Sequence, residues 1–153
     1  MREAFPAAYL LIVGPDEAND PVAPEVLEAL RNDDRVRLTG PDWSPAPLYA
    51  QMDLLCLPSH REGLPNVALE AAAMEVPVVA FRVPGVVDAV ESGTTGELVD
   101  PLSTEQIAAA ISKYFRQPSL RREHGLAGRR RMHDFFTREK VWTALTKFYL
   151  SVN

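Results

Sequence analysis

The sequence predicts an α/β fold, a Rossmann-like parallel sheet with helices on both faces and a helical C-terminal tail. Short apolar runs alternate with helical segments up to residue 100. Such runs, closed by turn residues, are typical of strands buried on both faces. After residue 100 the pattern is helical only. Strands separated by helices indicate a parallel sheet that is covered on both sides.

Each predicted strand is a short apolar segment. The segments cover residues 9–13, 36–39, 53–57, 77–81 and 96–99. In the first, from Tyr9 to Val13, apolar residues follow one another without a break, which predicts burial on both faces of the strand. Gly14-Pro15 and Gly40-Pro41 follow the first two segments, and both pairs are typical turn sequences.

The helices are predicted from their first residues and from their apolar spacing. Short helices are expected over residues 25–31, 47–52 and 65–74. Pro24 and Pro65 suit the start of two of them, because the first helical residue needs no backbone N–H. Beyond residue 100, apolar residues recur at helical spacing in two stripes. The stripes are Ile107, Ile111, Tyr114 and Phe115, then Val141, Leu145, Phe148, Tyr149 and Val152.

Length and composition indicate one soluble domain, residues 1–153. Apolar residues make up 46% and charged residues 24% of the chain, and no apolar run is long enough to span a membrane. The single cysteine, Cys56, cannot form an internal disulfide, so we expect a cytoplasmic protein. The formal charge of −5 argues against a nucleic-acid partner.

Basic residues are concentrated near the C-terminus. The segment from Lys113 to Lys147 contains ten basic and three acidic residues. Such a cluster is found on surfaces that meet phosphates or an anionic membrane, here the inner face of the membrane, and also on ordinary solvated helices. The sequence leaves both interpretations open.

Several common chemistries lack their sequence signals. The chain has neither a Gly-x-x-x-x-Gly-Lys-Ser/Thr loop nor a Gly-x-Gly-x-x-Gly turn, and its three histidines have no metal-ligand spacing. Ser59 lies after a strand but without the Gly-x-Ser-x-Gly frame of a nucleophile. A response-regulator receiver domain is excluded as well, because Gly14-Pro15 occupies the positions where its acidic pocket needs carboxylates.

The segment from Ser59 to Met74 is the most informative one. It reads as the end of a strand, a loop with Gly63, and a helix begun by Pro65. The first N–H groups of such a helix have no intrahelical acceptor, and the positive end of the helix dipole lies there. An anion site is therefore expected at the carboxyl edge of the sheet, where Gly63 lets the main chain approach a ligand.

Two carboxylates flank this expected anion site. Asn66 and Glu70 are four residues apart and share a helix face, with Glu70 one turn from the anion. A carboxylate there is placed to accept hydrogen bonds from vicinal hydroxyls such as those of a ribose. Glu62, on the loop, lies on the side where a sugar would be. From the residues alone, the alternative is two solvated carboxylates near a helix start, and the spacing by itself favours that interpretation.

The string "EGLPNVALEAAAMEVPVVAFRVPGVVDAVESGTTGELVDP", in which seven residues separate Glu62 from Glu70, resembles a known family. It is similar to the nucleotide-binding, C-terminal domain of retaining glycosyltransferases with the GT-B fold, glycosyltransferase family 4 (glycosyl transferases group 1). The similarity runs from Tyr9 to about Tyr149 and includes "RVRLTG", "LYAQMDLLCLPS" and "FTREKVWTALTKFY". It is strongest toward bacterial enzymes that build polysaccharide or lipid-linked glycans.

The resemblance implies roles for the two carboxylates and the loop between them. Glu70 would bind the ribose hydroxyls of the nucleotide. Glu62 would bind a hydroxyl of the donor sugar as the catalytic-site residue. The backbone at Gly63 and Leu64 would lie near the sugar.

The resemblance also implies the remaining donor contacts. The N–H groups of Asn66 and Val67 would face the diphosphate, and Thr39-Gly40 would border the base. The donor would be a UDP- or GDP-linked sugar, which is a substrate. No cofactor and no metal is expected, because helix dipoles and basic side chains stabilise the leaving diphosphate in GT-B enzymes.

The chain departs from the family pattern in three ways. The family's first strand of this half, with an Arg and a Lys for the diphosphate, should precede Tyr9 and is missing, as is the acceptor-binding N-terminal domain. Glu75 stands where family members usually have Gly. We therefore expect a domain incomplete at its N-terminal edge, inactive alone and prone to self-association. The alternative is a non-catalytic module that binds a nucleotide or sugar nucleotide and acts through a partner.

The second apolar stripe, from Val141 to Val152, has two open interpretations. In the family such a tail helix crosses toward the other half, whereas an ordinary helix would pack its stripe on the core of its own domain.

Overall fold

The computed structural model describes residues 2–15, 21–41 and 44–152. The chain divides into two compact units, Met1–Pro45 and Ala46–Asn153, and each is considered by itself. Among the described residues, no helix is both long enough and apolar enough to cross a membrane.

The first unit is a small βαβ arrangement. It contains β1 (Leu10–Ile12), α1 (Pro24–Arg31) and β2 (Val36–Leu38). The two strands pair in parallel, with Leu10 opposite Val36, as expected for strands joined through a helix. The expectation that the first strand is buried on both faces is wrong, because Leu10 is 47% exposed. β1 pairs with a single described strand, and no residue of α1 is buried, so this unit encloses little apolar surface.

The second unit holds the larger sheet. Its elements are α2 (Ala46–Tyr49), β3 (Leu55–Leu57), α3 (Asn66–Ala73), β4 (Val78–Phe81), α4 (Val86–Ala89), β5 (Gly96–Val99), α5 (Thr104–Arg116), α6 (Pro118–Phe135) and α7 (Arg138–Ser151). The strands pair in parallel in the order β3-β4-β5. The strand and helix order matches the prediction, apart from α4, which the sequence pattern did not indicate, and α6, which lies in the predicted helical region but between the two apolar stripes.

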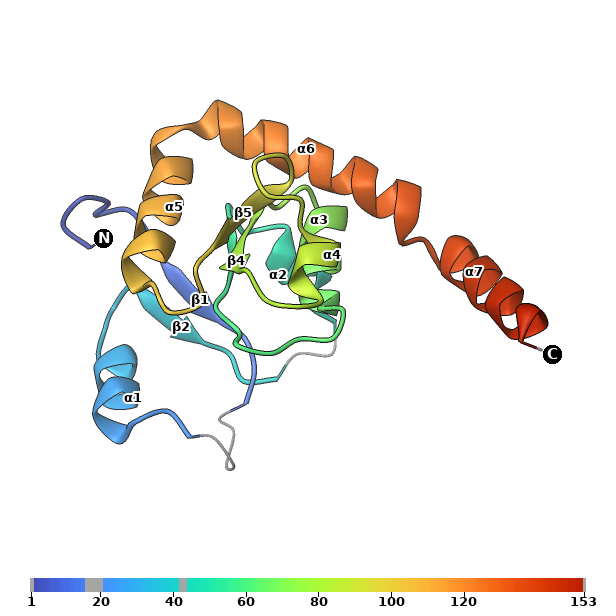
Figure 1. The fold of residues 1–153 in the computed structure, drawn as a ribbon. Coiled ribbons are helices and arrows are strands. Elements are labelled where there is room, and N and C mark those ends of the chain that lie inside the picture. The colour runs from blue at the N-terminus through green and yellow to red at the C-terminus, as the bar shows by residue number, and fades with distance from the viewer. Residues whose placement is uncertain (1, 16–20, 42–43, 153) are drawn as a thin grey trace. The chain divides into compact units, whose positions relative to one another are not determined.

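Helices cover both faces of this sheet, which confirms the predicted fold class. Every residue of the central strand β4 is buried. Val78 packs with Ala71 of α3 and Val86 of α4 in one hydrophobic cluster. The next residue, Val79, points to the opposite face and packs against Tyr114 of α5. Figure 1 shows α5 on one side of the strands and α3 and α4 on the other.

α3 ends in a left-handed turn that brings β4 into the sheet. The N–H of Glu75 donates to the carbonyl of Ala72, and the N–H of Val76 donates to that of Ala71. These two hydrogen bonds form the Schellman motif, which needs a positive φ at the residue after the C-cap. Glu75 has a φ of 62°, so the position favours glycine, in agreement with the residue that family members usually carry there.

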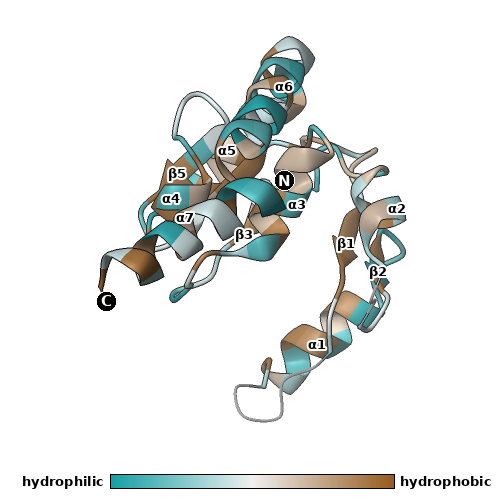
Figure 2. Cartoon of the chain, turned by 90° about the vertical axis from the view of Figure 1, so that its right-hand side faces the viewer, coloured by the Kyte–Doolittle hydropathy of each residue, from teal (hydrophilic) through white to brown (hydrophobic). Residues whose placement is uncertain are grey.

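α6 packs closely on α3 because it carries glycines at the contact. A Cβ on Gly125 would lie 2.0 Å from the carbonyl oxygen of Glu75, and one on Gly128 would lie 3.4 Å from the Cβ of Ala72. Both glycines are buried. In Figure 2, β5 is largely brown and α6 largely teal, since most of α6 faces solvent.

The last helix, α7, does not pack into the core of this chain. Every one of its residues is exposed, including Trp142 at 57% and Leu150 at 74%. Of the two interpretations of the second apolar stripe, core packing within this chain is therefore wrong.

Candidate functional site

The loop between β3 and α3 is fixed by a close backbone contact with Gly85. Gly85 has a φ of 83°, and a Cβ there would lie 1.4 Å from the carbonyl oxygen of Gly63 and 2.8 Å from that of Glu62. No side chain fits between these backbones, so Gly85 determines where the loop lies. Gly85 was not among the predicted site residues. Its signal in the sequence is the Pro84-Gly85 pair, a typical turn sequence that begins three residues after the buried strand β4.

The N-terminus of α3 presents free backbone donors. Its cap residue, Pro65, is buried and provides no side-chain hydrogen bond to the helix. The N–H groups of Ala68 and Leu69 donate to the carbonyl of Pro65, whereas those of Asn66 and Val67 have no acceptor among the described residues. Two free N–H groups at the positive end of a helix dipole form a site suited to an anion.

The loop before α3 carries a carboxylate with no partner. Glu62 is half-buried, and its side chain has neither a hydrogen bond nor an ion pair among the described residues. Gly63 and Leu64, which follow it, are exposed. Glu62 therefore has both carboxylate oxygens available to a ligand that contacts this loop.

Glu70 lies one turn into α3 and is already held on one side. Its Oε2 accepts a hydrogen bond of 3.0 Å from the hydroxyl of Tyr49, at the end of α2. Glu70 is exposed, and its Oε1 has no partner among the described residues. Tyr49 is only 5% exposed, and burial together with the neighbouring Glu70 raises the pKa of its hydroxyl. The hydroxyl therefore stays protonated as a donor.

The predicted site residues divide between the two units. Glu62, Gly63, Leu64, Asn66, Val67 and Glu70 all belong to the second unit, as does Tyr49. Thr39 and Gly40 belong to the first, where Gly40 has a φ of 69° and its carbonyl accepts from the N–H of Gly14 at 2.9 Å. Their assignment to the base stays a prediction.

Three arginines of the basic C-terminal segment form ion pairs along α6. They are Arg121 with Asp53 at 3.1 Å, Arg129 with Glu75 at 2.8 Å and Arg131 with Glu91 at 3.8 Å. On this helix, Arg122 and Arg130 are exposed and have no partner among the described residues. Part of the segment therefore attaches α6, and the contact with an anionic membrane stays a prediction.

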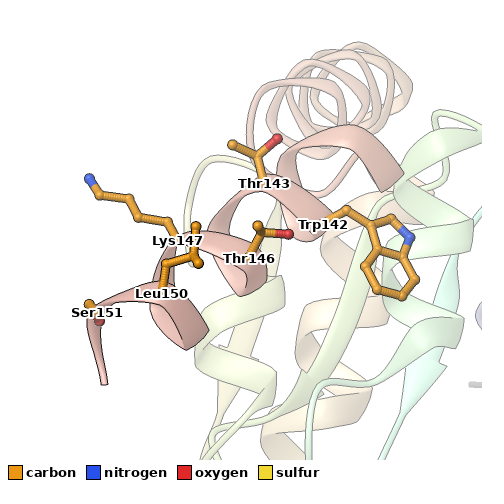
Figure 3. Close-up of a pocket in the computed structure, with 6 residues that line it drawn as sticks. All are labelled: Trp142, Thr143, Thr146, Lys147, Leu150 and Ser151. Carbon is orange, nitrogen blue, oxygen red and sulfur yellow. The ribbon is translucent and has the colours of Figure 1, made fainter. Parts of the chain in front are cut away.

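A metal site and an enclosed ligand pocket are the two other kinds of site to consider among the described residues. In the described part of the chain, no three His, Cys, Asp or Glu residues come together in a way that would hold a metal ion. A surface hollow follows α7 and contains none of the predicted site residues. Figure 3 shows that its six lining residues all come from that one helix, which cannot enclose a ligand alone.

Comparisons with known proteins agree with the resemblance. Residues 1–117 match the family described as Glycosyl transferases group 1. The chain is 34% identical over 140 residues to the capsular polysaccharide biosynthesis glycosyltransferase CapM of Staphylococcus aureus. That match covers 92% of this chain and 37% of CapM, so the chain spans about a third of the length of this relative.

Solved structures show the same fold. The C-terminal domain of LpcC, a glycosyl transferase group 1 family protein from Francisella tularensis, matches 90% of this chain and 74% of its own, with a TM-score of 0.77 and 22% identity. Alr3699/HepE from Anabaena, in complex with UDP-glucose, matches 95% of this chain and 42% of its own, with a TM-score of 0.85 and 22% identity.

Proposed function

This chain belongs to the glycosyl transferases group 1 family, and we propose that it is the donor-binding part of a retaining glycosyltransferase. The donor is a nucleotide-activated sugar, linked to UDP or GDP. In the reaction an acceptor hydroxyl oxygen bonds to the anomeric carbon of the sugar while the bond from that carbon to the diphosphate breaks, and the hydroxyl proton passes to the departing diphosphate. The product is part of a polysaccharide or a lipid-linked glycan. The name of the relative CapM, a capsular polysaccharide biosynthesis glycosyltransferase, supports this class of product.

The observation that carries the proposal is the uncapped N-terminus of α3 between two carboxylates. The free N–H groups of Asn66 and Val67 bind the diphosphate and stabilise the negative charge that grows on it as it leaves. Glu62 precedes these donors on the loop and accepts from a hydroxyl of the sugar. Glu70 follows them by one turn and accepts from the ribose hydroxyls through its unpartnered oxygen.

The experiment that tests this function measures nucleotide binding to the purified chain. We expect UDP or GDP to bind weakly, by ligand-observed NMR or calorimetry. Glu70→Ala removes two charge-assisted hydrogen bonds to the ribose, so its binding free energy should fall by about 2–4 kcal/mol. Glu123→Ala removes an exposed carboxylate from α6 and serves as the matched control. An unchanged dissociation constant in Glu70→Ala would contradict the ribose assignment.

A further inference from the structure

The Glu70 carboxylate is shared between the protein and its proposed ligand. Its Oε2 accepts from the Tyr49 hydroxyl at 3.0 Å, and its Oε1 has no partner among the described residues. An exposed glutamate with nothing to hold it samples several rotamers, and ordering such a side chain on binding costs conformational entropy. A donor fixed in the protein core can supply that order before the ligand arrives.

Tyr49 is such a fixed donor. Its side chain is 5% exposed and packs in the main hydrophobic cluster with Ala68 and Ala71 of α3, the helix that carries Glu70. The ring therefore has its position set by packing, and the hydroxyl is aimed at one oxygen of the carboxylate. A hydroxyl in this position adds one hydrogen bond and leaves the other carboxylate oxygen turned away from the protein.

We propose that Tyr49 is a positioning residue that holds the Glu70 carboxylate so that Oε1 is presented to the vicinal hydroxyls of a ribose. Tyr49 contacts no ligand in this arrangement and acts through Glu70 alone. The proposal rests on the proposed function, since it assumes that a ribonucleotide binds at the start of α3. It adds that the preference for a ribose over a deoxyribose depends on a residue of α2.

The test compares two ligands that differ only in the ribose hydroxyls, UDP and 2′,3′-dideoxy-UDP, with the GDP pair measured in parallel. Tyr49→Phe keeps the buried ring and removes only the hydroxyl. We expect this variant to bind UDP about 2- to 10-fold more weakly, the equivalent of one hydrogen bond, and to bind dideoxy-UDP as the unmodified chain does. A merely structural loss at the core would weaken both ligands equally, and that result would overturn the proposal.

A second comparison separates this proposal from the proposed function. Glu70→Ala should remove the preference for UDP over dideoxy-UDP, and adding Tyr49→Phe to it should cause no further change, because Tyr49 acts through Glu70. If Glu70→Ala lowers the preference but Tyr49→Phe does not, Tyr49 is not a positioning residue while the proposed function stands. If the unmodified chain does not distinguish the two ligands, the ribose assignment of Glu70 fails and the role of Tyr49 fails with it.

Protein stability is the control for this series. Thermal unfolding of Tyr49→Phe should show a folded chain. If Tyr49→Phe is destabilised, the ratio of its dissociation constants for dideoxy-UDP and UDP still reports the ribose preference, because both ligands bind the same folded fraction. A ratio equal to that of the unmodified chain would overturn the proposal.

Discussion

At the scale of single residues, the two site carboxylates differ in what already binds them. Glu70 is exposed, but one of its oxygens is occupied by a buried hydroxyl. Glu62 is half-buried and has no partner in the described part of the chain. Solvent can reach such a carboxylate in the free chain, so both of its oxygens are available to a ligand, which is the arrangement expected where a sugar hydroxyl binds.

Glu62 should therefore affect the sugar and not the nucleotide. In Glu62→Ala we expect binding of the best sugar nucleotide, found by screening UDP- and GDP-sugars, to weaken by about 1.5–3 kcal/mol, since a hydrogen bond to a charged group is lost. Binding of the free nucleoside diphosphate should stay unchanged. Calorimetric titration of both ligands measures the difference, and equal losses would remove Glu62 from the sugar site.

A buried histidine makes stability depend on pH. His124 is 4% exposed, and burial, the largest cause, lowers its pKa from the ordinary value of 6.5. The hydroxyl oxygen of Tyr114, which is fully buried, lies 2.7 Å from its Nδ1. With the ring proton on Nε2, Nδ1 accepts a hydrogen bond from the hydroxyl, and protonation of Nδ1 would remove that acceptor.

The direction of the pH effect follows from which state binds the proton. Below pH 6.5, His124 binds a proton in the unfolded chain but stays neutral in the folded chain until the pH reaches its lower folded pKa. The free energy of unfolding therefore falls as the pH drops from 6.5 toward the folded pKa. The slope from this one group is at most about 1.4 kcal/mol per pH unit. Urea unfolding of wild type and His124→Gln from pH 7.5 to 5 should show a smaller slope in the variant.

At the scale of elements, the sequence predicted what depends on neighbours along the chain. The apolar runs, Pro24 and Pro65 located the strands and two helix starts within a few residues. The free donors at the start of α3 followed from Pro65 in the same way. Tyr49 and Gly85 were not found as site residues, because Tyr49 is 21 residues from Glu70 and the contact of Gly85 with Gly63 is made by the folded backbone.

The turn after α3 provides a prediction about one element. Glu75 has a φ of 62°, which costs a side-chain-bearing residue about 1 kcal/mol relative to glycine. Glu75 also forms an ion pair with Arg129 at 2.8 Å. A single substitution of Glu75 by glycine therefore changes both the backbone strain and the ion pair. Glu75→Ala and Glu75→Gly both lose the ion pair and differ only in the Cβ. We expect the glycine variant to be more stable by about 1 kcal/mol in urea unfolding. A less stable glycine variant would contradict left-handed strain at this turn.

At the scale of the whole molecule, the apolar core lies in one unit. Both hydrophobic clusters are formed by residues from Tyr49 onward, within Ala46–Asn153, and the free donors of α3 and both site carboxylates lie there too. The exposed apolar residues of α7 belong to the same unit. Donor binding is therefore expected from this unit, whereas self-association through α7 stays a prediction.

The last prediction concerns sugar transfer by these 153 residues alone. Donor binding places the anomeric carbon, but transfer also requires an acceptor hydroxyl held next to that carbon, on the face from which the diphosphate leaves when configuration is retained. Two reactants held in the right geometry react as if at effective concentrations of up to about 10⁵–10⁸ M. In GT-B enzymes the acceptor-binding half holds the acceptor in that geometry. The chain spans 37% of the length of CapM, and its proposed site contacts account for the donor only.

We therefore expect no transfer above background when the purified chain is incubated with radiolabelled UDP- and GDP-sugars and a crude lipid acceptor. The same preparation should still bind the nucleoside diphosphate, which shows that it is folded and that its donor site is intact. Transfer that is robust in the unmodified chain and lost in Glu70→Ala would show that these residues hold an acceptor as well, and the donor-only assignment would be wrong. Transfer that persists in Glu70→Ala would instead indicate a contaminating enzyme, because the variant lacks the carboxylate on which donor binding is proposed to depend.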